Sequence, residues 1–253
     1  MTPDRYLRGI LLREHVDASA RSPVLGVQRA VNPILRAWAG RQLVGIAPSG
    51  SFAKGTASRS GTDIDLFVSL SSSVTMTLEA IYESLFSTLH GAQLAPQRQN
   101  VSIGIRVGDY DVDVVPAKRQ GNAGNDHSLY RRRAGTWTKT NVARHISEVR
   151  RSGRTEEIRV IKLWRDQSGL EFPSFYLELT VIDALAGKHR GNLAANVWAV
   201  FAYLRDRFPG ARVVDPANTS NTVSDDLTAA EKAAVTEAAQ RALAAKSWGE
   251  IVS

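Results

Sequence analysis

The fold of this chain is decided by the stretch Gly50-Ser51-Phe52-Ala53-Lys54-Gly55-Thr56, followed by Asp63-Ile64-Asp65-Leu66. Successive side chains of a strand point to opposite faces, so Asp63 and Asp65 are expected to project from one face. The neighbouring Ile64 and Leu66 would then point into a core and anchor the strand. Carboxylate oxygens are the ligands that Mg²⁺ prefers, so the pair predicts a shared cation site.

A glycine-serine turn precedes these acids. At Gly50-Ser51 the backbone amides can approach a phosphate closely, with the serine hydroxyl as an additional donor. Lys54 adds a positive charge that suits a polyphosphate. The glycine-serine turn and the acid pair are each common by themselves, and an acid pair of this kind usually lies on a solvated strand face. Their combination, with eleven residues between Ser51 and Asp63, is specific. It predicts a polyphosphate held beside a carboxylate-bound metal ion.

A third acid is expected on a later strand. Asp109, Asp111 and Asp113 alternate along the segment 109–115, so all three would share one face. Periodicity alone leaves the choice among them open.

The joint pattern resembles the signature of the DNA polymerase β-like nucleotidyltransferases. Asp113 begins Asp-Val-Val-Pro, which is similar to the third-acid strand of that family, and Asp111 is the fallback. The resemblance implies catalytic and metal-binding roles for Asp63, Asp65 and Asp113. It also implies Mg²⁺, with Mn²⁺ as a substitute, and a two-metal transfer of a nucleoside monophosphate that releases pyrophosphate.

Four further blocks resemble one branch of this superfamily, that of the oligoadenylate synthases and the bacterial enzymes related to cyclic GMP-AMP synthase (CD-NTases). These blocks are residues 139–145, 160–164, 172–178 and 215–221. The branch implies nucleoside triphosphates as substrates, with ATP expected, and an active site in a cleft between two lobes. Its members usually run longer than this chain, so a linear product is expected as readily as a cyclic one.

The same resemblance implies nucleotide contacts in the second half of the chain. Lys162 would contact the donor triphosphate. Ser174 and Phe175 would line the base pocket, with an aromatic face stacking on a purine. Tyr176 would take that part if the register shifts by one residue. The competing interpretations are a surface lysine beside a buried stripe, and a helix start with its aromatic side chains in the core.

The pattern of elements predicts an α+β fold, with a mixed β-sheet in a catalytic lobe at 1–120 and a mainly helical lobe at 121–253. Strands are expected at 43–47, 63–70, 100–107 and 110–116, with a polar loop at 118–127 and an irregular connection at 215–221. Helices are expected at 4–20, 23–40, 77–90, 139–151, 154–168, 174–187, 191–207 and 228–246.

Composition narrows the class of protein. The chain has 253 residues, 43% of them hydrophobic, no cysteine and a net charge of +7. No apolar run approaches the roughly 18 to 20 residues that span a bilayer. The absence of cysteine and of a signal-peptide core favours a soluble, cytoplasmic protein. The basic balance, with arginine runs at 131–133 and 150–159, favours polyanionic partners, and an RNA or oligonucleotide on a basic face is one of them.

The leading functional hypothesis is a template-independent synthase of a nucleotide second messenger in antiviral defence, whose product a downstream effector senses. The alternative enzyme is a nucleotidyltransferase acting on tRNA 3′ ends, as a CCA-adding enzyme or a toxin would. Nucleotidyltransferases of antibiotics fit less well, because their cationic substrates would be repelled by a basic chain. The non-enzyme alternative is a degenerate nucleic-acid-binding module.

Overall fold

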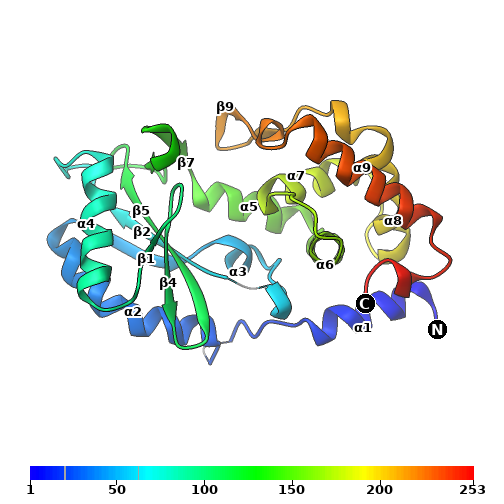
Figure 1. Ribbon diagram of the computed structural model, residues 1–253, viewed down its shortest axis with the longest axis horizontal. Coiled ribbons are helices and arrows are strands. Elements are labelled where there is room, and N and C mark those ends of the chain that lie inside the picture. The colour runs from blue at the N-terminus through cyan, green and yellow to red at the C-terminus, as the bar shows by residue number, and fades with distance from the viewer. Residues whose placement is uncertain (20, 62) are drawn as a thin grey trace. The chain divides into compact units, whose positions relative to one another are not determined.

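The computed structural model describes residues 1–19, 21–61 and 63–253, which form two compact units. The sheet unit comprises Val16–Lys54 and Thr62–Ile146, and the helical unit comprises Met1–His15, Gly55–Gly61 and Ser147–Ser253. Figure 1 labels the helices and strands of both units. The units interleave along the chain instead of dividing at residue 120, and the expected functional division into two lobes stays a prediction. No helix in the described ranges is long and apolar enough to cross a membrane.

The sheet unit contains a seven-stranded mixed sheet, as the α+β prediction requires. Its strand order is β1-β2-β5-β4-β3, and β6 pairs with both β5 and β7. Only β2 and β5 run parallel among these pairs in the described chain. The strands are β1 (Leu43–Pro48), β2 (Ile64–Leu70), β3 (Gln97–Arg98), β4 (Ile103–Val107), β5 (Tyr110–Arg119), β6 (His127–Arg131) and β7 (Thr136–Thr140).

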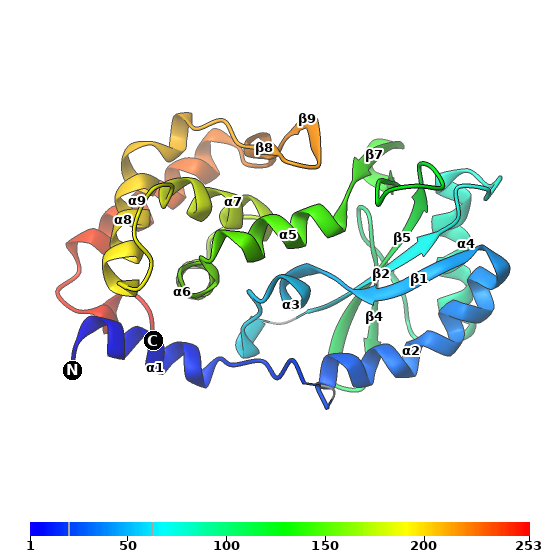
Figure 2. The ribbon, with the colours of Figure 1, turned by 180° about the vertical axis from the view of Figure 1, so that it is seen from behind.

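Helices α2 (Pro23–Ala39) and α4 (Leu78–Gly91) cover one face of this sheet (Figures 1 and 2). Helix α2 begins where its sequence allows, because Ser22 accepts a hydrogen bond from the amide of Val24 and proline occupies the first turn. The alternate residues of β2 supply the facing core: Ile64, Leu66 and Val68 are fully buried. The opposite face of β2 carries the polar alternates, including Asp65. The short helices of this unit are α3 (Gly50–Lys54), η1 (Gly40–Gln42) and η3 (Arg132–Ala134).

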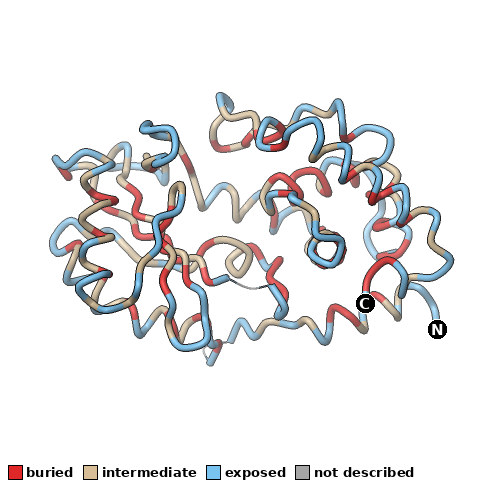
Figure 3. The backbone as a smooth tube through the Cα atoms, in the orientation of Figure 1, coloured by how far each residue is buried: buried red, intermediate tan, exposed pale blue. Residues whose placement is uncertain are grey.

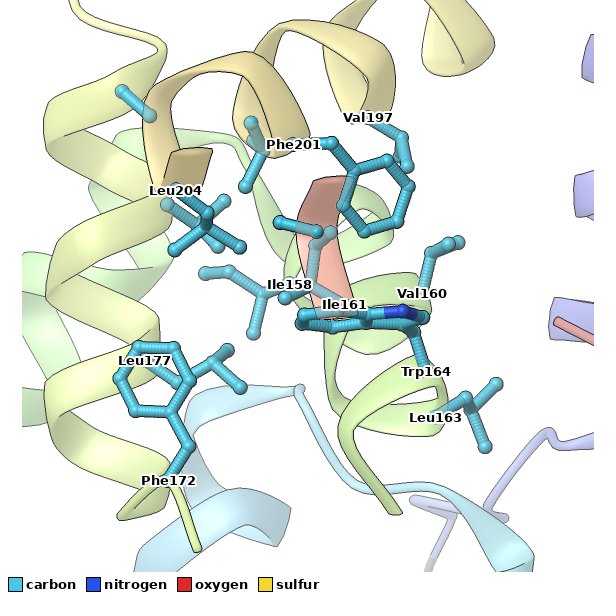
Figure 4. Close-up of a cluster of buried hydrophobic side chains, with 14 of the residues drawn as sticks. Ile158, Val160, Ile161, Leu163, Trp164, Phe172, Leu177, Val197, Phe201 and Leu204 are labelled. Atoms are coloured by element: carbon cyan, nitrogen blue, oxygen red, sulfur yellow. The ribbon is translucent and has the colours of Figure 1, made fainter. Parts of the chain in front are cut away.

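The helical unit is built mainly from long helices around one apolar core. The burial map in Figure 3 shows buried stretches on each of these helices. In Figure 4, Trp164 lies beneath Phe201, and their ring centroids are 5.0 Å apart. The elements are α1 (Pro3–Arg13), η2 (Arg59–Gly61), α6 (Thr155–Gln167), α7 (Ser174–Ala184), α8 (Leu193–Asp206), η4 (Phe208–Gly210), β8 (Val214–Asp215), β9 (Asn218–Thr222), η5 (Val223–Asp226), α9 (Ala229–Ala244) and η6 (Trp248–Glu250), while α5 (Val142–Ser152) begins in the sheet unit.

Three sequence-based expectations need correction. The first helix was expected to reach residue 20 and ends at Arg13. The segment 127–140 forms the hairpin of β6 and β7, so the predicted loop at 118–127 is confined to residues 120–126 and the helix expected from 139 begins at Val142. The connection expected at 215–221 contains the β8–β9 pair. All three errors concern short segments, whose structure depends on partners distant in the sequence.

A buried arginine binds backbone carbonyls just after the end of α7 in the helical unit. Arg154 is 5% exposed and pairs with Glu157 at 3.2 Å. Its guanidinium also donates hydrogen bonds to the carbonyls of Leu185, Lys188 and His189. One side chain therefore satisfies several carbonyls at the helix end, where no intrahelical donor is available.

Replacing Arg154 with methionine should lower the free energy of unfolding by about 3 kcal/mol, because it leaves the carboxylate of Glu157 buried without its charge partner. Urea denaturation monitored by circular dichroism would measure the change. The matched control is Arg150→Met on the exposed face of α5, which should cost less than about 0.5 kcal/mol. Equal effects of the two substitutions would contradict the role assigned to Arg154.

Candidate active site

The two acid-bearing strands lie side by side in the sheet unit. Strands β2 and β5 are parallel, and their register places Asp65 directly beside Asp113. The preceding pair in the same register is Ile64 with Val112, and both are fully buried. The apolar alternates thus anchor both strands in the core, so that the two carboxylates emerge together on the opposite face. Asp63 immediately precedes β2 and is exposed.

Gly50 approaches the carboxylate of Asp65 so closely that no other residue fits. Its backbone has φ +54°, and a Cβ built there would lie 1.7 Å from Oδ2 of Asp65. The amide of Ser49 also donates a hydrogen bond to the carbonyl of Asp65 at 2.8 Å. The glycine-serine turn and the acid pair therefore form one local structure, although eleven residues separate Ser51 from Asp63.

Part of this eleven-residue spacer belongs to the helical unit, namely residues Gly55–Gly61. There, Oγ1 of Thr56 donates a hydrogen bond to Oε1 of Glu178 at 2.7 Å, and Nζ of Lys162 donates to the carbonyl of Thr56 at 3.3 Å. Thr56 and Glu178 are fully buried. The length of the spacer thus reflects its participation in a second core.

The carboxylates of the site disfavour one another's charge. Burial raises the pKa of Asp63, and the nearby charge of Asp111 raises it further. Burial also raises the pKa of Asp113, and the charge of Asp63 adds to this, while hydrogen bonds from Gln99 and Ser102 oppose the shift. Carboxylates that repel one another are stabilised by a cation placed between them.

A hydrogen-bonded chain orients Asp113. Nε2 of Gln99 donates to Oδ1 of Asp113 at 2.8 Å, and Oγ of Ser102 donates to Oε1 of Gln99 at 2.6 Å. The hydroxyl of Tyr82 lies 3.0 Å from the carbonyl of Gln99 and 2.9 Å from that of Ser102. Sequence reasoning missed Gln99, because its role depends on folding the connection between β3 and β4 against β5. The only signal in the sequence is a polar cluster before a strand.

Asp111, the alternative third acid, has a different environment. It forms an ion pair with Arg106 at 3.1 Å, and both side chains are more than 60% exposed. In contrast to Asp113, it lies opposite Arg106 of the neighbouring strand β4 rather than beside Asp65. Asp111 nevertheless lines the same cavity of roughly 520 Å³ as Asp63, Asp113 and Gln99.

The chemistry of the acid cluster fits a divalent cation. Within the described ranges, no group of three His, Asp or Glu side chains is arranged closely enough to form a complete metal site. The donors at hand are carboxylate oxygens, which suit Mg²⁺ or Mn²⁺. A cation beside Asp63 and Asp113 would stabilise the charged forms that burial and neighbouring carboxylates disfavour. We therefore treat Asp63, Asp65 and Asp113 as the residues that would hold the metal.

The residues predicted to bind nucleotide have varied surroundings. In the sheet unit, Ser51 is half-buried within α3 and Lys54 is 9% exposed. In the helical unit, Lys162 is 7% exposed, with its Nζ 4.0 Å from Oε1 of Glu178. It is therefore a buried lysine and not the surface lysine of the competing interpretation.

The segment Ser174–Tyr176 begins helix α7. Ser174 accepts a hydrogen bond from Nη1 of Arg165 at 2.9 Å, and Phe175 is partly buried against the core. Tyr176 is fully buried and stacked on Phe208, and burial raises its pKa to about 12. Its ring therefore lies in the core in this structure, whereas Phe175 keeps some exposed surface.

Comparison with known proteins identifies sequence and structural relatives of this chain. No family model matches the chain. The chain is 27% identical over 235 residues to a cyclic AMP-AMP-AMP synthase of Escherichia coli (strain MS 115-1), covering 77% of this chain and 73% of the relative. The same bacterium's CdnC, solved in complex with HORMA-deltaN, matches with a TM-score of 0.75 and 22% identity over 95% of this chain and 89% of CdnC.

A second solved structure matches equally well in shape. It is the CD-NTase CdnG of Bradyrhizobium diazoefficiens in complex with GTP, with a TM-score of 0.76 and 14% identity, covering 98% of this chain and 95% of CdnG. The chain is therefore similar in sequence and in fold to CD-NTases of the polymerase β-like nucleotidyltransferases. The resemblance expected from the sequence and the α+β fold are thereby confirmed. Given this similarity, the paired acids of β2 and β5 are the candidate catalytic centre.

Proposed function

We propose that this protein is a metal-dependent, template-independent nucleotidyltransferase of the CD-NTase type that makes a cyclic or linear oligonucleotide second messenger from nucleoside triphosphates. The observation that carries the proposal is the register of Asp65 beside Asp113, with Gly50 packed against the carboxylate of Asp65. The sequence relative supports the choice of product, because it is named as a cyclic AMP-AMP-AMP synthase.

In this proposal Asp63, Asp65 and Asp113 hold Mg²⁺, which Mn²⁺ can replace. When bound, such ions activate the attacking hydroxyl and stabilise the charge on the leaving pyrophosphate. At Gly50-Ser51 the backbone amides can approach a phosphate, and Ser51 offers its hydroxyl as a donor. Lys54, at the end of α3, contributes positive charge.

The helical unit contributes the remaining contacts in the proposal. Lys162 binds the donor triphosphate, and Ser174 with Phe175 lines the base pocket, where the ring stacks on a purine. Tyr176 takes that part only if the register shifts by one residue, since its ring lies in the core against Phe208. ATP is the expected donor, the cytoplasm the expected location, and a separate effector protein the expected reader of the product. An RNA or oligonucleotide on the basic face remains part of the proposal.

The proposal is tested by incubating the pure protein with labelled ribo- and deoxynucleoside triphosphates and Mg²⁺ or Mn²⁺. Small products that resist phosphatase indicate a cyclase, and a phosphatase-sensitive ladder indicates linear synthesis. Label that appears only after tRNA is added would instead support transfer to tRNA 3′ ends. Nucleotide binding without any product under all these conditions would favour the degenerate binding module.

Replacing Gln99 with alanine should slow nucleotidyl transfer by about tenfold to a hundredfold, because Asp113 loses the donor that fixes its carboxylate. Initial rates at saturating Mg²⁺, together with the Mg²⁺ concentration for half-maximal rate, would measure the effect. The control is Gln97→Ala on the exposed strand β3, which lines the same cavity and should change the rate less than twofold. An unchanged rate in Gln99→Ala would contradict the positioning role.

A further inference from the structure

The sheet unit contains a second cavity that shares no lining residue with the acid cluster. Its volume is roughly 320 Å³, at the small end of the range for small-molecule sites. Strands β1, β2 and β6 and the start of α5 form its walls. Most of the wall is apolar, and its larger apolar side chains are Val44, Ile46, Phe67, Val142 and Ile146.

Arg119, the last residue of β5, lines this cavity. Among the residues that the structure describes, none offers a hydrogen-bond acceptor to its buried Nε. No carboxylate in the described parts of the chain pairs with its guanidinium. A buried Nε–H without an acceptor carries an uncompensated desolvation cost. An anion entering the cavity would remove that cost.

The other polar groups of the cavity leave this positive charge unbalanced. Nδ1 of His127 donates a hydrogen bond to the carbonyl of Asn125 at 2.8 Å, so its Nε2 accepts one from Oγ of Ser69 at 2.7 Å. The imidazole also lies edge-on to Phe67, with ring centroids 5.0 Å apart. Burial lowers the pKa of His127, and the charge of Arg119 lowers it further. The histidine is therefore neutral, and both of its ring nitrogens are hydrogen-bonded.

We propose that this cavity is a binding site for a small amphipathic anion, with an aromatic or aliphatic body against Phe67, Ile46 and Val142 and a carboxylate or phosphate on Arg119. The apolar wall supplies most of the buried surface, and the guanidinium supplies orientation through charge-assisted hydrogen bonds. Because the site shares no lining residue with the acid cavity, it is separate from the predicted nucleotide site.

The test compares two probes of equal shape, 2-naphthoate and the neutral 2-naphthamide, by calorimetry or by saturation-transfer NMR on the full chain. Naphthoate should bind with a Kd of about 1 mM or lower, as expected for a ligand of its size. The amide should bind about tenfold more weakly, because it lacks the charge-assisted contact. Equal affinities of the two probes, or no binding of naphthoate at this level, would overturn the proposal.

Three variants locate the site. Arg119→Gln should reduce naphthoate binding to the level of the amide, whereas Arg36→Gln, which removes an exposed charge from α2, should leave it unchanged. Ala143→Phe, at an exposed position of α5 that lines the cavity, should weaken both probes. Circular dichroism would verify that each variant folds. A loss shared equally by Arg119→Gln and Arg36→Gln would show non-specific attraction and overturn the assignment.

A competition experiment separates this site from the nucleotide site. Saturating ATP with Mg²⁺ should leave the affinity for naphthoate unchanged. Displacement of naphthoate by ATP would show that the cavity belongs to the nucleotide site, and the proposal would fail. The outcome does not depend on turnover, so it holds whether or not the proposed synthase activity is found.

Discussion

Replacing Asp65 with asparagine should reduce nucleotidyl transfer by about 10³-fold or more, which corresponds to a loss of about 4 kcal/mol of transition-state stabilisation. The substitution keeps the shape of the side chain and its place beside Asp113, but it removes one of the negative charges that would hold the metal. Rates of product formation from labelled nucleoside triphosphates would measure the loss. Nucleotide binding, measured by calorimetry, should largely persist.

The matched control is Asp111→Asn. This acid lines the same cavity, but it is exposed and already paired with Arg106. We expect its rate to change by less than about tenfold, because solvent screens an exposed charge pair strongly. If Asp65→Asn kept full activity while Asp111→Asn lost it, the metal ligands would have to be reassigned to Asp111.

Replacing Gly50 with alanine should also reduce the rate by about 10³-fold, comparable to the loss of Asp65 itself. The added Cβ would lie 1.7 Å from Oδ2 of Asp65, so the carboxylate must leave its position beside Asp113. The positive φ of Gly50 adds about 1 to 2 kcal/mol of backbone strain. Activity and the free energy of unfolding should therefore be measured together.

The control Gly108→Ala separates the effect of backbone strain from the effect of displacing the Asp65 carboxylate. Gly108 has φ +59° and nothing within 4 Å of the position of a Cβ, so it carries the strain of Gly50→Ala without the clash. Both variants should lose about 1 to 2 kcal/mol of stability, but Gly108→Ala should keep nearly full activity. If the two variants lost activity equally, the close approach of Gly50 to Asp65 would not be the cause.

The parts of the fold that the sequence predicts well are those decided by local pattern. The alternation at Ile64, Leu66 and Val68 predicts strand β2 and assigns Asp65 to its other face, and the structure has both features. The long helices of the second half agree to within a few residues, because glycine and proline mark their ends. Hydrophobic periodicity and turn chemistry are properties of neighbouring residues, so a single sequence contains them.

The parts that could not be predicted depend on partners distant in the sequence. Strands β6 and β7 are short and polar, and they form because β5 extends to Arg119 and pairs with β6. The burial of Lys162 requires Thr56 and Glu178, which come from different segments of the chain. Gln99 likewise gains its role only when Asp113 is placed opposite it. Such contacts are products of tertiary structure, which no local propensity encodes.

The interleaving of the two units has a consequence for protein engineering. The chain changes unit after His15, Lys54, Gly61 and Ile146, so neither unit is a contiguous cassette. A chimera that exchanges the sheet unit with that of a CD-NTase therefore needs four junctions. Two of these junctions bracket the seven residues Gly55–Gly61, so a graft of the glycine-serine turn must carry the matching spacer, or adapt Lys162 and Glu178 to the new one.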